Sequence, residues 1–158
     1  MSSPVIVIDT NKILASILRP GRVRKLLFTA QAVLVTPVYA WQEVCEKIGE
    51  LAERRGVSPE ETTALLEEMR DEVIVEEAPK RPYEDSAKEI ASSFDPDDWP
   101  FIALALEYGA PVWTNDKDMI RRALEHGEYR AVDTRGVEML LRGRPWGVVE
   151  EYLRREYG

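Results

Sequence analysis

The chain has 158 residues, of which 44% are hydrophobic and 32% charged, and its formal net charge at pH 7 is -8. This length predicts a single domain, 1–158, that buries roughly 70% of the surface of its unfolded chain. The acidic balance argues against long-range attraction to nucleic acid, although a local basic patch can still bind it. One cysteine and one histidine exclude an internal disulfide framework and zinc sites built on these residue types.

No apolar run approaches the ~20 residues that a membrane-spanning helix needs, and no signal peptide precedes the first predicted strand. We therefore expect a cytoplasmic protein with no membrane partner. Because histidine and cysteine are nearly absent, a bound metal ion would need oxygen ligands, and oxygen ligands favour Mg²⁺ or Mn²⁺.

Short apolar runs alternate with helical patterns along the chain. The first run, PVIVID, has no polar alternation and ends in Asp9, which is typical of a central strand covered on both faces. The strands are predicted at 4–9, 32–36, 73–77, 111–115 and 129–132, and the helices between Asp9 and Pro20 and at about 22–31, 37–55, 59–72, 83–93, 100–108, 119–126, 134–141 and 145–157. This alternation predicts an α/β fold with a mostly parallel sheet of about five strands.

Two of these helices have apolar stripes that locate their packed faces. On the helix at about 37–55, Cys45 falls on the stripe and is expected in the core, whereas Glu43 and Glu46 fall away from it and are expected to be solvated. On the last helix, apolar side chains gather on one side, so we expect it to dock on the domain or on a second subunit; they are Trp146, Val149, Tyr152 and Leu153.

The stretch from Asp95 to Asp118 contains the most informative pattern. Asp97 and Asp98 precede a Trp-Pro pair, and every residue from 101 to 106 is apolar, which predicts a helix buried on most sides. Gly109 ends that helix, and the short strand after it stops at Asn115-Asp116. Aspartates therefore flank a buried helix–strand unit at both ends.

The aspartates of this unit have two interpretations. Taken singly, Asp97 or Asp98 is explained as a helix N-cap and Asp116 as a turn or cap residue. Taken together with Asp9, they converge, because ligands of parallel sheets bind outside the carboxyl ends of the strands. Three or four carboxylates at one point repel one another unless a cation neutralises them, and divalent ions of this kind assist phosphoryl transfer or hydrolysis.

Three ordered segments resemble the signature segments of PIN-domain ribonucleases, a family that includes the VapC-like toxins of VapBC toxin–antitoxin pairs. They are V-I-D-T-N at 7–11, D-D-W-P-F-I-A-L-A-L at 97–106 and W-T-N-D-K-D at 113–118. The resemblance covers essentially the whole chain. It implies a three-layer fold with a five-stranded parallel sheet in the order 3-2-1-4-5, and an acidic cluster that binds Mg²⁺ or Mn²⁺ and cuts single-stranded RNA.

The resemblance also assigns residues to roles. Asp9, Asp98 and Asp116 match the metal-binding aspartates, with Asp95 and Asp97 as alternatives to Asp98. Glu43 matches the glutamate on the helix after the second strand, on resemblance alone, and Glu46 is its alternative. Asn11, Thr114 and Asp118 match residues that orient ligands and water, although turn and cap roles explain them equally well.

The expected activity is metal-assisted hydrolysis of a phosphodiester by an endoribonuclease. One alternative is an aspartyl-nucleophile phosphatase, which needs an aspartate two residues after the nucleophile, where this chain has Asn11. The other is a catalytically silent interaction or RNA-binding module with the same fold.

The expected partners are RNA, a small antitoxin protein if the chain is a toxin, and a second copy in a homodimer; the last two follow from the resemblance alone. Four cations just past the first helix are candidates for RNA contact, with a solvated basic surface as the alternative; they are Arg19, Arg22, Arg24 and Lys25.

Overall fold

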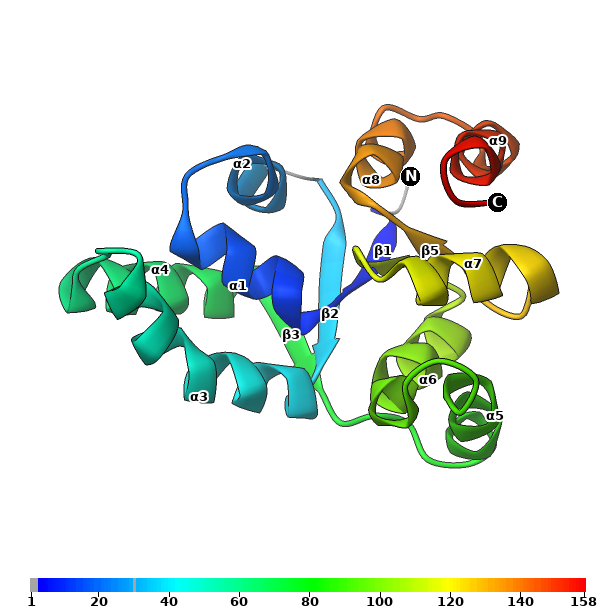
Figure 1. The fold of residues 1–158 in the computed structure, drawn as a ribbon, viewed down its shortest axis with the longest axis horizontal. Coiled ribbons are helices and arrows are strands. Elements are labelled where there is room, and N and C mark those ends of the chain that lie inside the picture. The colour runs from blue at the N-terminus through cyan, green and yellow to red at the C-terminus, as the bar shows by residue number, and fades with distance from the viewer. Residues whose placement is uncertain (1–2, 30) are drawn as a thin grey trace.

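Five parallel strands form the centre of the molecule (Figure 1). The structure is a computed structural model that describes residues 3–29 and 31–158. The strands lie in the order β3-β2-β1-β4-β5, with bounds Val73–Glu76, Val33–Pro37, Val5–Ile8, Val112–Trp113 and Ala131–Val132. Val7 of β1 is in register with Val35 of β2 and Val112 of β4. This confirms the predicted α/β class, strand order and central first strand.

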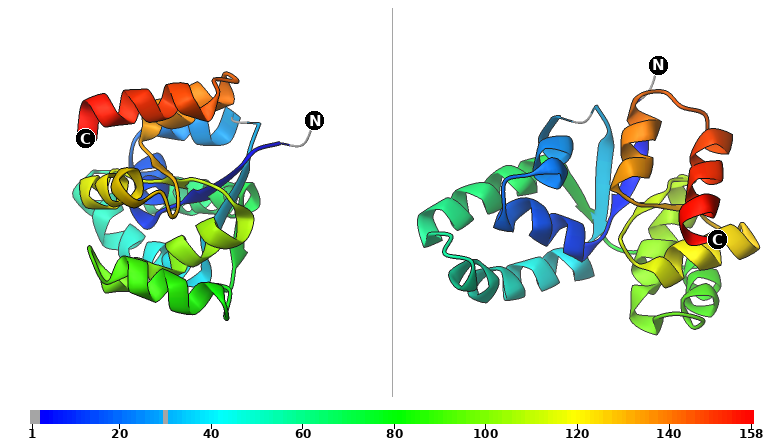
Figure 2. Two further views of the ribbon diagram at one scale, coloured as in Figure 1. Left: turned by 90° about the vertical axis from the view of Figure 1, so that its right-hand side faces the viewer. Right: turned by 45° about the horizontal axis from the view of Figure 1, so that its top comes forward.

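Helices cover both faces of the sheet. Helix α6 (Trp99–Tyr108) packs on β1, β2 and β4, and α5 (Tyr83–Ala91) packs on α6. Figures 1 and 2 place this pair on the opposite side of the sheet from α2 and α8. The remaining helices are α1 (Thr10–Leu18), α2 (Arg22–Thr29), α3 (Val38–Arg54), α4 (Pro59–Glu72), α7 (Lys117–His126), α8 (Thr134–Leu141) and α9 (Trp146–Tyr157).

The buried helix α6 forms as its sequence predicts. Its residues from Phe101 to Ala105 are all buried, because both the sheet and α5 cover them. A 3₁₀ turn, η1 (Pro96–Asp98), leads into the helix. Gly109 ends it with a φ of 60°, a left-handed conformation that only glycine adopts without strain. The chain then returns at once into β4.

Two predictions about these elements need correction. Cys45 is exposed, because it lies one residue, about 100° of helix rotation, beyond Val44, which points into the core. Strand β4 ends at Trp113 and α7 begins at Lys117, two residues earlier than predicted. Asp116 explains the early start, since its carboxylate accepts hydrogen bonds from two backbone N–H groups of the first turn.

The C-terminal helix is docked on the domain through a buried aspartate. Asp133 follows β5, and its Oδ1 accepts from Gly136 N (2.8 Å), which caps α8. Its Oδ2 accepts hydrogen bonds from the hydroxyl groups of Tyr152 (2.5 Å) and Tyr157 (2.7 Å) of α9. Val149 and Leu153 of α9 are fully buried. The expected docking of the last helix therefore takes place on the domain itself.

In residues 3–29 and 31–158, no helix combines the length and apolar character that a bilayer crossing requires.

Removing the Tyr152 hydroxyl tests this docking. Tyr152→Phe should lower the free energy of unfolding by about 1.5–3 kcal/mol, because a buried carboxylate loses a charge-assisted hydrogen bond. Denaturant unfolding measures the change. Tyr83→Phe is the matched control, since the half-buried Tyr83 makes no side-chain hydrogen bond within the described residues. Equal stability of the two variants would contradict the role assigned to Asp133.

Candidate metal centre

A cavity of about 570 Å³ opens at the carboxyl ends of β1 and β4. Six carboxylates line it: Asp9, Glu43, Asp95, Asp97, Asp98 and Asp116. Asp9 directly follows β1, and Asp116 follows β4 after two intervening residues. Because Ile8 and Trp113 are in register on neighbouring parallel strands, these two aspartates emerge at the same point. The residues that the sequence placed at separate strand ends are thus brought together.

Asp9 is the most enclosed of the six carboxylates. Its Oδ1 accepts a hydrogen bond from Lys12 N (2.9 Å), which caps α1. The Thr114 hydroxyl also hydrogen-bonds to it. Burial raises the pKa of Asp9, and the bonds from Thr114 and Lys12 only partly offset that effect. The side chain is therefore fixed in direction but poorly solvated as an anion.

Asp116 is held at the opposite wall by the same threonine. Its backbone N–H donates to Thr114 Oγ1 (3.0 Å), and its Oδ1 accepts from the backbone N–H groups of Asp118 (2.9 Å) and Met119 (3.2 Å). The cap interpretation of Asp116 is therefore correct, and Asp9 caps α1 in a similar way. Each of these backbone capping bonds engages Oδ1.

Asp98 differs from the other two because no capping bond engages its side chain. It occupies the N-cap position of α6, yet its carboxylate accepts no hydrogen bond from that helix. Burial, and after it the charges of Asp95, Asp116, Asp9 and Glu43, together raise the pKa of Asp98 to about 7. Asp95 and Asp97 also line the cavity but are exposed, and Asp95 Oδ1 caps η1 by accepting from Asp97 N (3.0 Å). Among these three aspartates, the geometry favours Asp98 as a ligand.

Glu43 lies in the cavity wall, and Glu46 does not. The first turns of α3 face the cavity with Tyr39, Glu43 and Lys47, which are spaced by four residues and so share one side of the helix. Glu43 is half-buried and forms an ion pair with Lys47 (3.3 Å), whereas Glu46 is exposed and outside the lining. The helical pattern predicted that both were solvated, because it detects only the apolar stripe. A polar face at the start of a helix that follows a strand was the signal for Glu43.

The structure separates the three residues expected to orient ligands. Thr114 is buried and contacts both Asp9 and Asp116. Asn11 is exposed and lines the cavity. Asp118 is exposed and outside the lining, and only its backbone N–H reaches the site.

Sequence patterns missed a buried cation behind Asp9. Lys12 is only 4% exposed, and its Nζ donates to Thr134 Oγ1 (3.4 Å). Burial lowers the pKa of this lysine, while the charges of Asp9 and Asp133 act in the opposite direction. The position of Lys12 on its helix does not predict burial. The available signal was its place in the first helical turn after a buried aspartate.

The residues that line the cavity fit a divalent ion in their chemistry. The negatively charged groups in the lining are all carboxylates, whose oxygen atoms are the ligands that Mg²⁺ and Mn²⁺ prefer. Thr10 Oγ1, also in the lining, is buried and has no hydrogen-bond partner among the described residues, so the cavity wall has an unsatisfied polar group. As the side chains lie, no three acidic, histidine or cysteine residues of 3–29 and 31–158 are close enough to hold one ion. Like charges repel, so the carboxylates would have to rotate toward a cation.

The raised pKa of Asp98 predicts a pH-dependent stability. Between the usual value of 3.8 and about 7 the native state binds more protons than the unfolded chain. The resulting stabilisation is complete below pH 3.8 and is lost as the pH rises through about 7. In chelator, the melting temperature of Asp98→Asn should therefore fall less over this window than that of the wild type. Asp118→Asn, outside the cavity, should keep the wild-type slope; equal slopes for wild type and Asp98→Asn would contradict the pKa assignment.

The comparisons with known proteins agree with the geometry. The PIN-domain family model matches residues 7–138, a span that contains every residue lining the cavity. A search of curated proteins gave no significant match to the chain. The match covers well over half of the sequence and confirms the resemblance of the three motifs. The chain therefore belongs to the PIN-domain family, whose members are generally nucleases that use divalent metal ions.

Proposed function

We propose that this protein is a divalent-metal-dependent endoribonuclease that hydrolyses phosphodiester bonds of single-stranded RNA. The observation that supports the proposal is the convergence of six carboxylates on one cavity, in which burial and the neighbouring carboxylates together raise the pKa of Asp98 to about 7. Clusters of strongly perturbed groups in a cleft are typical of functional sites. If these carboxylates had only a structural role, the repulsion among them would remain uncompensated.

Four carboxylates have the proposed ligand role: Asp9, Asp98 and Asp116, assisted by Glu43. A bound Mg²⁺ or Mn²⁺ supplies activation of water and neutralisation of charge on the phosphate oxygens. Thr114 holds the Asp9 carboxylate and the backbone of Asp116 in place, so that the pair is preorganised. Among the described residues that line the cavity, none is a histidine or cysteine that could act as base or nucleophile.

Lys12 and Asn11 complete the proposed site. The buried ammonium group of Lys12 partly offsets the charge of Asp9 from behind the cavity. Asn11 stands two residues after Asp9, where an aspartyl-nucleophile phosphatase needs a second carboxylate, which favours the nuclease over that alternative.

We further propose that the protein is the toxin of a VapC-like pair, held by a small antitoxin protein, and that it acts as a homodimer. The support is the sequence resemblance. A short adjacent reading frame that encodes a DNA-binding protein with a basic N-terminal part, and that copurifies with this chain, is the expected finding for the pair. Light scattering of the purified chain tests the dimer.

Metal addition and aspartate replacement test the proposed site together. Mn²⁺ should raise the melting temperature of the wild type. At a Mn²⁺ concentration of a hundred times its Kd, the free energy of unfolding should increase by about 2.7 kcal/mol. Asp9→Asn and Asp98→Asn should each abolish cleavage of unstructured RNA and remove most of the metal-induced shift. In chelator, neither should melt below the wild type, because each loses a repelling charge and an asparagine can still cap a helix.

Glu43→Gln and Glu46→Gln form the matched pair for the glutamate assignment. Glu43→Gln should reduce cleavage and the metal-induced shift, and Glu46→Gln should change neither. The reverse result would transfer the ligand role to Glu46. A wild type that Mn²⁺ does not stabilise and that leaves RNA intact would favour the catalytically silent module.

A further inference from the structure

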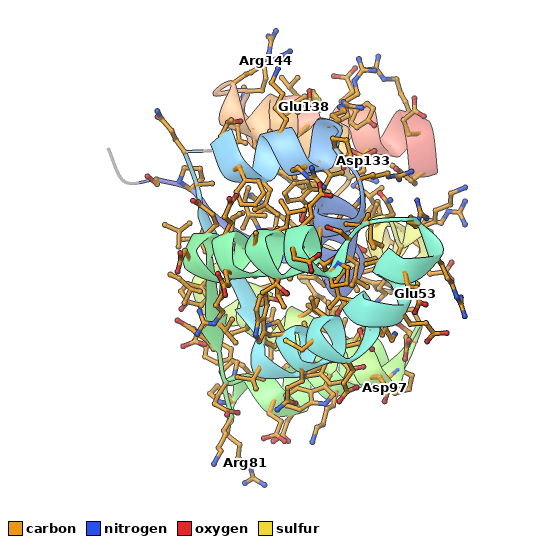
Figure 3. The ribbon with its side chains drawn as sticks, turned by 90° about the vertical axis from the view of Figure 1, so that its left-hand side faces the viewer. Glu53, Arg81, Asp97, Asp133, Glu138 and Arg144 are labelled. Carbon is orange, nitrogen blue, oxygen red and sulfur yellow. The ribbon has the colours of Figure 1, made fainter. Side chains whose placement is uncertain are left out.

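A second hollow of opposite charge runs along α8, on the side of α2. We call it the basic groove and define it by Arg22, Lys25, Arg135, Glu138, Arg142 and Arg144. It comprises adjoining hollows of about 540 and 340 Å³ that share Arg22, Glu138 and Arg142. Five cationic side chains thus face one carboxylate, in a chain whose formal net charge is -8. Asp97 lines the acidic cavity, and Figure 3 shows Glu138 and Arg144 far from it.

Most cations of the basic groove lack a neutralising partner. Arg22 forms an ion pair with Glu138, and the Arg135 guanidinium lies over the Tyr152 ring (5.2 Å). Within the described residues, no carboxylate lies within ion-pair distance of Lys25, Arg142 or Arg144. Elsewhere on the surface, some arginines form ion pairs, such as Arg54, Arg122 and Arg154, whereas others, such as Arg55 and Arg155, form none within the described residues. Lys25, Arg142 and Arg144 differ from these others in lying together along one groove.

The groove differs from the basic region expected from sequence. Arg24 donates to the carbonyl groups of Ser16 (2.6 Å) and Ile17 (2.9 Å), so it closes the end of α1 rather than facing the groove. Arg19 is exposed and does not line either hollow. Only Arg22 and Lys25 of that region line the groove, and α8 and the turn after it supply the other cations.

The turn that contains two of these arginines is fixed by backbone bonds. Arg142 N donates to Glu138 O (3.1 Å) and Arg144 N to Met139 O (3.1 Å), which fold the chain back on the end of α8. The backbone that carries these two exposed side chains is thereby fixed. A planar guanidinium matches two phosphate oxygens, and a turn that is already ordered adds no entropy cost of loop ordering on binding.

We propose that the basic groove binds the phosphate backbone of single-stranded RNA outside the acidic cavity. This inference rests on the proposed ribonuclease function. The acidic cavity has one cationic side chain in its lining, Lys47, and Glu43 already neutralises it, so a polyanion needs its attraction elsewhere. The groove begins at Arg135, next to Thr134, which accepts a hydrogen bond from Lys12 behind Asp9. Without aromatic residues in its lining, the groove offers phosphate contacts rather than base stacking.

The test compares two double variants that remove the same charge. Binding of labelled polyuridine is measured by fluorescence anisotropy in chelator, over a range of salt concentrations. Arg142→Gln/Arg144→Gln should weaken binding about tenfold and reduce the salt slope by about 1.4, the value for two phosphate contacts to a single strand. The control, Arg55→Gln/Arg81→Gln, removes exposed cations outside the groove, and Figure 3 shows Arg81 at the opposite end of the molecule from Arg144. It should keep wild-type binding.

Each outcome distinguishes the groove from the nuclease activity. Equal RNA affinity of the two double variants would contradict RNA binding by the groove, even if the wild type cleaves RNA with Mn²⁺. If binding depended on the groove but the wild type never cleaved RNA, the groove proposal would stand and the nuclease proposal would be wrong. If polyglutamate bound the wild type as tightly as polyuridine does, and the groove variant lost this binding, the surface would be assigned to an acidic protein instead. Unchanged melting temperatures verify that both double variants are folded.

Discussion

The repulsion among carboxylates at the ends of β1 and β4 is the constraint on which the functional interpretation depends. Parallel pairing of these strands brings Asp9 and Asp116 to one point, and the start of α6 adds Asp98. The fold compensates only in part, through Thr114 and the capped helix ends. Burial, together with the remaining repulsion, raises the pKa of Asp98 to about 7. A divalent ion is the compensation that the donor chemistry fits.

Asp133 connects this edge of the sheet to the C-terminal helix. Its carboxylate accepts from both Tyr152 and Tyr157, and its charge acts on Lys12, which in turn acts on Asp9. Thr134 accepts from Lys12 Nζ and from Trp113 Nε1 (3.1 Å), so a buried polar network runs behind the cavity wall. Buried networks of this kind are costly when a member is lost, which ties the integrity of the cavity wall to the docking of α9.

The charge distribution is compatible with the proposed action of this acidic protein on a polyanion. The negative charges with an expected catalytic use lie in one cavity, and unpaired arginines gather along α8. Net charge alone predicted weak attraction to nucleic acid, because it averages over surfaces of opposite sign. The local arrangement, and not the total, determines which part of the surface a phosphate backbone meets.

The sequence by itself determined the α/β class, the central first strand, the buried α6 and the family, because unbroken apolar runs and three motifs encode them locally. It also predicted Asp9 and Asp116 at the ends of two strands, and Asp98 at the start of α6 with Asp95 and Asp97 as alternatives. Only the tertiary structure showed that Glu43 lines the cavity and Glu46 does not, that Cys45 is exposed and that Lys12 is buried, because a helical pattern does not determine what covers a polar face. The basic groove likewise required the fold, since its cations come from segments that are distant in sequence and line one groove only after α2 and α8 are brought to its two sides.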